Sequence, residues 1–576
     1  MEAVVIVAGL CMAFTLYAMP FGVTRLSTNE FFLMDRSAAV KQYNDTTVAY
    51  STQVAVTVYF FYWGFRYGLS NIMFIASWFL GLLVFGLSAA PLAKFVSSVD
   101  FDGSLFSLIS SKSRALRSTM GGLFIVSLIG LLFTEVYLTA TFVNGVTLAR
   151  RVPSVAPNFY FWVSFIFLAV AVLWYCSLGG MRKVVATDTW QISIAYVGMA
   201  VLTAALAPSI NGYAGTSAMM FVEIGMSILF ILMAALPSIT SRFVQKNPRF
   251  RYTSTTVVTL IALITSAAIC FSPVVALPRN IGTANLLPAS TFSFPKGILT
   301  IFADPFGWAP VVGFTIINMV WQFSDYTAFH RLAILSLPED LNSRETKIRE
   351  SIFATMFNSP LTWGLGIFAG MAVSATNLVP STSTDVFNDF VSQAAKYANA
   401  GNTSLQLCLV GLAAFLGSIM LSTVDTGFMS VALIVVRDII KKPLSVAARL
   451  IVNVGVVAIM AAFALVIVDM KINILVFLNA TYSWGLIFGG ITIAYLLGKK
   501  VSRSWAYVSL GLGATIGAIS TVNIGLPDLV ALIFPSVAAI VISGGIILFA
   551  PSRPGTAPPS EPTPRHAEPP TQQAIS

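Results

Sequence analysis

The stretch LQLCLVGLAAFLGSIMLSTVDTGFMSVALIVVRD, residues 405–438, decides the fold class. It opens on an apolar run that is long enough to cross a bilayer as a helix, which takes about 20 residues. Ser422, Thr423, Asp425 and Thr426 interrupt that run near its middle. Polar groups at membrane depth are costly and are candidates for a functional site by default. The stretch therefore predicts a membrane-spanning helix that carries a polar site.

The composition extends this prediction to the whole chain. Of 576 residues, 57% are hydrophobic and 10% are charged, and the mean hydropathy is +0.83. Soluble chains carry about 25% charged residues, so a soluble enzyme is excluded. We expect an all-α polytopic membrane protein with about 15 transmembrane helices. The candidate spans are 3–24, 46–68, 70–93, 119–148, 158–178, 188–209, 218–239, 254–275, 309–330, 351–375, 403–436, 443–469, 472–497, 503–522 and 527–550.

The net charge of +10 comes from basic residues in the short segments between these spans. Their alternation follows the positive-inside rule when the N-terminus lies outside and the C-terminus lies in the cytoplasm. Membrane topology thus accounts for the charge, and we expect no nucleic-acid partner. The predicted location is the cell (inner) membrane, with lipid as the surrounding partner. The proline-rich segment 551–576 is expected to form a disordered cytoplasmic tail.

The polar residues of three spans are the candidate site. Hydroxyl groups such as those of Ser422 and Thr423 are hard donors that suit a monovalent cation, although they also bond to carbonyls one turn earlier in a helix. In 46–68, Ser51, Thr52 and Gln53 precede an aromatic run, and a local unwinding there would free carbonyls. Aromatic packing is the alternative for that run.

The third candidate span ends in MVWQFSDYTAFHR, residues 319–331, and a charged inner loop is expected after it. Gln322 and Asp325 lie one turn apart near its inner end, where Asp325 either binds substrate or pairs with Arg331. Glu135 is a further buried carboxylate, for which a structural ion pair or a helix–helix hydrogen bond is the commoner reason. The chain contains no P-loop, G-x-S-x-G or H-E-x-x-H in a suitable context, so we expect a gradient-driven transporter and no enzyme.

The stretch YCSLGGMRKVVATDTWQ, residues 175–191, resembles the signature of the sodium:solute symporter family, which includes sodium/glucose- and sodium/proline-type symporters. The run LSTVDT, residues 421–426, resembles the eighth core helix of that family. The resemblance implies that the hydroxyls of Ser422 and Thr423 ligate sodium together with the carbonyl of Ile419. It places further sodium-binding carbonyls at Ala49 and Thr52 of the first core helix.

The same resemblance implies a substrate site beside the sodium. Ser51 and Gln53 come close to substrate when the first core helix is aligned on its glycines. The segment that ends at Arg331 resembles the sixth core helix, in which the residue six positions before the arginine, here Asp325, faces substrate. Gln322 and Tyr326 are assigned to the same site. An acidic group beside aromatic rings suits an amine and equally suits sugar or polyol hydroxyls.

The resemblance also implies a domain organisation of two inverted five-helix repeats, a LeuT-like core. The expected units are a leading helix (1–24), the first repeat (46–209), an inserted helix pair with an outer connection (210–308), the second repeat (309–497), trailing helices (498–550) and the tail (551–576). The family pattern has only an outer connection between the repeats. The inserted pair, 218–275, is therefore a candidate surface for a partner.

These observations predict a sodium-coupled secondary active symporter that imports a small organic solute by alternating access. Sodium is then a co-transported ion and not a cofactor. A proton-coupled symporter remains the nearest alternative, because Asp425 lies among the hydroxyls. A non-transporting solute sensor or partner-binding membrane protein is the second alternative.

Overall fold

The computed structural model describes residues 2–18, 26–67, 72–98, 100–110, 113–148, 158–211, 308–356, 359–375, 378–380, 383, 385–442, 445–470, 474–499, 501–519 and 528–551. Nearly all of them lie in helices, and the one β-bridge among them pairs Ala38 with Leu335. The inserted pair at 218–275 and the tail after Pro551 lie outside the described residues. Both therefore stay predictions.

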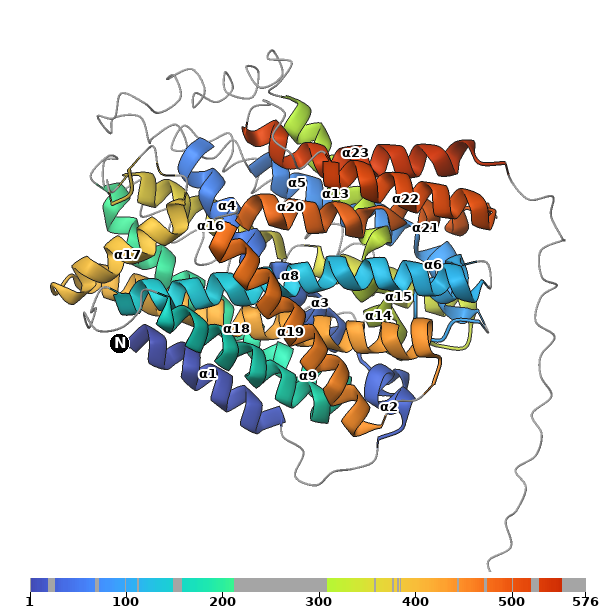
Figure 1. Ribbon diagram of the computed structural model, residues 1–576, viewed down its shortest axis with the longest axis horizontal. Helices are drawn as coiled ribbons and strands as arrows, with labels where there is room; N and C mark the ends of the chain where they lie inside the picture. Colours follow the sequence, from blue (N-terminus) through green and yellow to red (C-terminus); the bar gives the residue numbers. More distant parts are fainter. Residues whose placement is uncertain are drawn as a thin grey trace, which may run out of the picture.

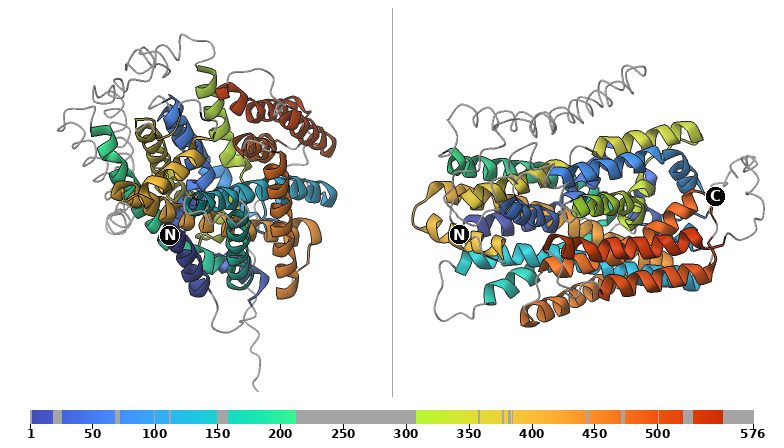
Figure 2. Two further views of the ribbon diagram at one scale, coloured as in Figure 1. Left: turned by 60° about the vertical axis from the view of Figure 1, so that its left-hand side comes forward. Right: turned by 90° about the horizontal axis from the view of Figure 1, so that it is seen from above.

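The helices lie side by side along one direction and form a bundle (Figures 1 and 2). In chain order they are α1 (Glu2–Ala18), α2 (Thr28–Leu33), η1 (Met34–Arg36), α3 (Val40–Thr52), α4 (Val54–Tyr67), α5 (Ile72–Leu87), α6 (Ala89–Ser97), α7 (Phe106–Ile109), α8 (Arg114–Leu148), α9 (Phe159–Asn211), α13 (Trp308–Ser324), α14 (Tyr326–Ile334), α15 (Leu341–Thr355), α16 (Ser359–Ala375), α17 (Val386–Asn399), α18 (Thr403–Ile434), η7 (Val435–Ile440), α19 (Val446–Met470), α20 (Ile474–Leu486), α21 (Phe488–Leu496), α22 (Arg503–Ile519) and α23 (Asp528–Phe549). α1 begins at one end of the bundle and α23 ends at the other (Figure 2).

Two helical spans are interrupted in the middle of the bundle. Gln53 separates α3 from α4 and has a positive φ of 38°, which a residue with a side chain rarely adopts. Asp325 separates α13 from α14, and its carboxylate accepts a hydrogen bond from the Thr327 N–H at 2.9 Å. Such breaks leave backbone groups without helical partners at membrane depth, where ions and substrates bind in transporters.

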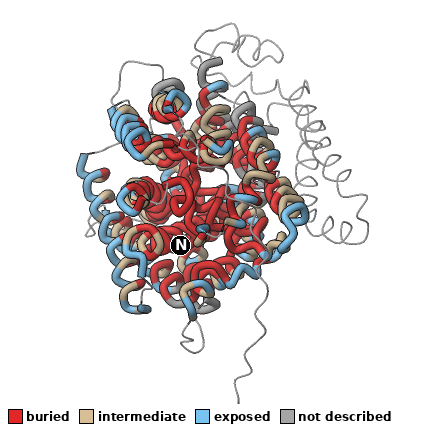
Figure 3. Tube along the Cα trace, turned by 90° about the vertical axis from the view of Figure 1, so that its right-hand side faces the viewer, coloured by how far each residue is buried: buried red, intermediate tan, exposed pale blue. Residues whose placement is uncertain are grey.

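The apolar residues divide between the interior and the outer surface. The centre of the bundle is buried, and exposed residues lie on its periphery (Figure 3). Large apolar side chains such as Ile451 and Val466 of α19 and Leu548 of α23 are among those exposed. Buried polar side chains, by contrast, gather inside the bundle. This distribution is what lipid around the bundle requires.

The expected number of about 15 spans stays a prediction. Among the described residues, four helices are long and apolar enough to cross a membrane, or six if two bent pairs each count as one span. Shorter apolar helices, among them Ala3–Phe14 and Ile533–Phe549, add to these. The two five-helix repeats likewise stay a prediction.

Several helices differ from the sequence-based expectation, among them α15 and α17. The charged segment expected as a loop forms α15, because Asp340 accepts a hydrogen bond from the Ser343 N–H at 2.7 Å and caps the helix. The span expected at 351–375 is therefore divided between α15 and α16. The helix α17 was not anticipated. It is amphipathic and short of a full span, so a search for long apolar runs does not detect it.

Glycines allow α4 and α16 to cross at close range. A Cβ atom added at Gly370 would lie 2.0 Å from the carbonyl oxygen of Phe61 and 2.7 Å from the backbone nitrogen of Phe65. Gly64 meets the backbone of Ile367 in the same way, with 2.1 Å to its carbonyl oxygen. Backbone atoms cannot move aside as a side chain does. The contact between the first broken span and α16 therefore requires glycine.

Gly370→Ala is expected to destabilise the protein by about 1–3 kcal/mol, the usual cost of overpacking. Gly122→Ala is the matched control, because a Cβ atom at Gly122 meets nothing within 4 Å. Removing a helical glycine at such a site is neutral or favourable. Thermal unfolding of the purified proteins in detergent, followed by tryptophan fluorescence, measures both. Equal melting temperatures for the two variants would contradict the close crossing.

Candidate functional site

A cavity opens beside the two helix breaks. Its lining comes from the first broken span (α3 and α4), the second (α13 and α14), and from α5, α15, α16, α20 and α23. Its polar lining residues include Thr47, Ser51, Gln53, Asn318, Gln322, Asp325, Arg331, Asn479 and Ser536. Its aromatic lining residues are Tyr50, Tyr59, Phe60, Trp78, Phe314, Trp321, Trp363 and Tyr482. An aromatic wall with a few polar groups is typical of a site for a small organic molecule.

Four residues assigned to substrate from the sequence lie in this lining: Ser51, Gln53, Gln322 and Asp325. The fifth, Tyr326, is buried elsewhere. Its ring packs against Phe106 and Phe124, with centroids 5.3 and 5.8 Å apart, and its hydroxyl donates to Asp438 at 3.4 Å. Tyr326 is the first residue of α14, directly after the break. Its side chain therefore points toward Phe106, whereas Asp325 lines the cavity.

Asp325 is held in place by a relay of hydrogen bonds within α14. The Thr327 hydroxyl lies 2.7 Å from both carboxylate oxygens and donates to them. Arg331 donates to the same hydroxyl oxygen at 2.9 Å, and its guanidinium lies over the Tyr50 ring, 4.2 Å from the centroid. The arginine thus reaches Asp325 through Thr327. Asp325 is also one of the residues that line the cavity, so the choice between substrate contact and pairing with Arg331 stays a prediction.

Gln53 connects the first break to the far wall of the cavity. Its side-chain oxygen accepts a hydrogen bond from the Tyr482 hydroxyl of α20. The Tyr482 ring packs edge-on against Trp321 of α13, with centroids 4.9 Å apart. Through these two contacts, Tyr482 of α20 is connected to both broken spans. The sequence contains no motif that identifies Tyr482 or Trp321, because residues scattered over separate helices form the wall.

A second polar cluster lies between α3, α9 and α18. Ser422 donates to Asp188 Oδ1 at 2.5 Å, and both residues are fully buried. Thr46 of α3 lies beside Asp188, and its hydroxyl interacts with the carboxylate. Within the described part of the chain, the hydroxyl oxygen of Thr423 is buried without a hydrogen-bond partner. Buried polar atoms without partners are rare and call for an explanation such as a bound ion.

Asp188 is the residue of this cluster that sequence reasoning did not assign to the site. The signal was present, because Asp188 belongs to the stretch 175–191 that carries the family resemblance. The sequence cannot show its contact with Ser422, since 234 positions separate the two residues. The helix α9 bends at Gly180, where φ is 63°, and continues to Asp188.

The backbone positions assigned to sodium lie on the buried faces of α3 and α18. Ala49 and Ile419 are fully buried. The Thr52 carbonyl, directly before the break, accepts hydrogen bonds from Trp363 Nε1 and Thr57 Oγ1, each at 3.2 Å. In this conformation the Thr52 carbonyl therefore has protein partners.

Glu135 supports the first break from α8. Its carboxylate is fully buried and accepts hydrogen bonds from the N–H groups of Val54 and Ala55, at 2.8 and 2.9 Å. These groups begin α4 and have no helical partner of their own. The carboxyl oxygens lie at the positive end of the helix, where acceptors of these N–H groups are favourable. The helix–helix hydrogen bond expected for Glu135 is thus observed.

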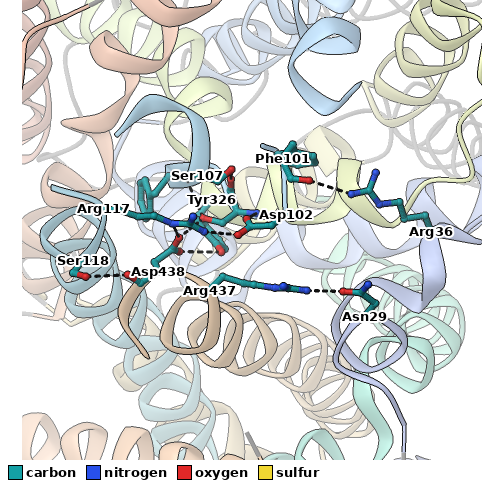
Figure 4. Close-up of polar contacts among 12 residues, drawn as sticks. Asn29, Arg36, Phe101, Asp102, Ser107, Arg117, Ser118, Tyr326, Arg437 and Asp438 are labelled. Carbon is teal, nitrogen blue, oxygen red and sulfur yellow. Dashed lines mark hydrogen bonds and ion pairs between the residues drawn. The ribbon is translucent and has the colours of Figure 1, made fainter. Parts of the chain in front are cut away.

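Asp438 closes a polar network at the end of α18 (Figure 4). Its carboxylate accepts from Arg117 Nε at 2.5 Å, from Ser104 at 2.6 Å and from Tyr326. Arg117 also pairs with Asp102 at 2.7 Å. The network joins the helix of Ser422 and Thr423 to α14, which begins directly after Asp325.

Known proteins resemble this chain in structure and not in sequence. No family model and no curated protein sequence matches the chain. A solved structure of a Na⁺-coupled sialic acid symporter, in a substrate-bound outward-open state, is similar over 96% of this chain and 98% of its own, at 13% identity and a TM-score of 0.59. A manganese transporter from Eremococcus coleocola, in complex with an aromatic bis-isothiourea compound, matches 88% of this chain and 93% of its own, at 14% identity and a TM-score of 0.46. The similarity to the sialic acid symporter shows that this chain shares the fold of that symporter.

Proposed function

We propose that the protein is a sodium-coupled symporter that imports a small organic solute by alternating access. The observation that carries the proposal is the buried polar cluster in which Ser422 donates to Asp188, with the hydroxyl of Thr423, which has no partner among the described residues, on the next residue of α18. A buried carboxylate is costly unless a cation compensates it. The cluster lies beside a broken span in a fold whose solved representative couples transport to sodium.

Sodium would be held by Asp188 Oδ2 and by the hydroxyl oxygens of Ser422 and Thr423. The carbonyls of Ala49, Thr52 and Ile419 are the proposed backbone ligands. Sodium prefers such oxygen donors, and its charge would neutralise that of Asp188. The ion would thereby join α3, α9 and α18 and fix the position of the helix end that precedes Gln53.

Solute would bind in the cavity between the breaks. Asp325, Gln53 and Gln322 supply polar contacts, and the aromatic wall supplies faces for a ring, a methylene or a cationic group. Sodium binding and solute binding are coupled because α3 supplies proposed sodium ligands and ends directly before Gln53, which lines the cavity. One sodium that moves inward through 100 mV supplies about 2.3 kcal/mol, which supports roughly fortyfold accumulation of solute.

Flux measurements test this function. Purified protein in liposomes is expected to accumulate a solute from a panel of amines, sugars, polyols and organic acids when an inward sodium gradient is applied. Accumulation should collapse when the gradient is dissipated and should fail with potassium or choline in place of sodium. Sodium-independent accumulation of every transported solute would contradict the proposal.

Proton coupling is the second candidate, and the buried carboxylate of Glu135 favours it. If Glu135 carried the coupling proton, Glu135→Gln would abolish accumulation driven by a pH gradient while exchange of solute persisted. We expect instead that sodium-driven accumulation survives in this variant, with a loss of stability of about 1–2 kcal/mol, because glutamine accepts the two N–H bonds less well. Thermal unfolding and flux on the same preparation separate the two roles.

A further inference from the structure

A groove of about 380 Å³ lies at the far end of α18, away from the solute cavity. It is lined by Ser27, Thr28, Asn29, Asp102, Arg117, Val436, Arg437, Lys441 and Lys442. Lys441 and Lys442 directly follow the apolar span, which ends at Ile440. Lys441 has a positive φ of 59°, so the chain turns sharply there. The groove thus lies where a membrane-spanning helix reaches the bilayer surface.

The groove contains more positive charge than its own carboxylates compensate. Asp102 and Asp438 each form an ion pair with Arg117. Within the described residues, Lys441 and Lys442 have no carboxylate partner, and Arg437 bonds only to the neutral side-chain oxygen of Asn29, at 2.5 Å (Figure 4). Arg437 Nε is buried and has no hydrogen-bond partner. Arg437, Lys441 and Lys442 therefore line the groove with N–H donors that no carboxylate in the described part of the chain accepts.

Arg36 lines a separate pocket but lies near enough to Arg437 of the groove for the two charges to repel (Figure 4). It donates to the Phe101 carbonyl oxygen at 3.2 Å and has a positive φ of 56°. Burial lowers the pKa of its guanidinium, and repulsion from Arg344 and Arg437 lowers it further. Like charges held together by the fold are unfavourable, and a bound anion removes that cost.

We propose that this groove binds a phosphate group. Guanidinium and ammonium groups together are the usual ligands of phosphate, because arginine donates in a fork and lysine supplies a point charge. A lipid headgroup at the membrane surface and a free phosphate in the cytoplasm share this chemistry. A phosphate bound here would hold the end of α18 and, through Asp438, the network that reaches α14.

Thermal stability of the purified protein in detergent tests the site with three additives: phosphatidylglycerol, phosphatidylcholine as the zwitterionic control, and inorganic phosphate at constant ionic strength. The variants are Lys441→Gln with Lys442→Gln, and separately Arg437→Gln. The matched control is Lys396→Gln with Arg503→Gln, which removes two exposed cations elsewhere. The double lysine variant changes only exposed side chains, so it tests the site even if Arg437→Gln fails to fold.

We expect stabilisation by phosphatidylglycerol or by inorganic phosphate and none by phosphatidylcholine. The half-effect concentration should rise about thirtyfold in the double lysine variant, since each basic residue near an anionic surface contributes about fivefold, and should stay unchanged in the control. Stabilisation by the lipid alone assigns the site to a headgroup, and stabilisation by inorganic phosphate with the same residue dependence assigns it to a soluble phosphate. No stabilisation by either, or an equal loss in the control, would overturn the proposal.

Discussion

Asp188→Asn is expected to remove the sodium-specific rise in thermal stability that the wild-type protein should show. The substitution keeps the size of the side chain and its bond to Ser422 but removes the negative charge from a fully buried position. A charge-assisted contact is worth about 1.5–3 kcal/mol, which corresponds to a loss of sodium affinity of about tenfold to a hundredfold.

The measurement is the melting temperature across a sodium series, with choline or potassium chloride keeping the ionic strength constant. Thr423→Ala should behave like Asp188→Asn, because the Thr423 hydroxyl is a proposed ligand of the same ion. Asp469→Asn is the control, since Asp469 is an exposed carboxylate at the end of α19. If the asparagine at 188 left the sodium response unchanged while the protein folded normally, this cluster would not be the ion site.

Asp325→Asn is expected to weaken solute binding about tenfold to a hundredfold without changing sodium affinity. The carboxylate lines the cavity and is oriented by Thr327, so asparagine keeps the shape and the helix cap but loses the charge. The solute that gives the largest stabilisation of the wild-type protein in sodium serves as the probe. Its half-effect concentration and that of sodium are compared in both proteins.

The control for Asp325 is Asp340→Asn, because Asp340 also caps a helix but lies on the surface. Equal loss of solute and sodium binding in Asp325→Asn would show that the carboxylate only supports the fold around the break. Unchanged binding of both ligands would show that the charge of Asp325 contacts neither ligand and that the residue serves only to cap α14 through Thr327.

Long apolar runs and the polar residues within them could be predicted from the sequence. The span that carries Ser422 and Thr423 forms α18, and the unwinding expected within 46–68 occurs at Gln53. Both follow from local patterns, because an apolar run of bilayer length and a cluster of polar residues inside it are each visible without knowledge of distant contacts.

The remaining features depend on contacts between distant segments. Asp188 joins Ser422 across 234 positions, and Tyr482 joins Gln53 across 429. Tyr326 was assigned to substrate as a neighbour of Asp325, but the change of direction at the break places its ring against Phe106. The charged α15 and the amphipathic α17 escaped detection because hydropathy does not report a helix that is stabilised by capping and by one buried face.

Binding of ²²Na⁺ to the purified protein tests the central claim most directly. The proposal predicts saturable binding that unlabelled sodium displaces, that potassium and choline do not displace, and that Thr423→Ala weakens while Gly122→Ala leaves it unchanged. Absence of saturable binding to the folded wild-type protein, or identical binding in Thr423→Ala, would contradict a sodium site on α18.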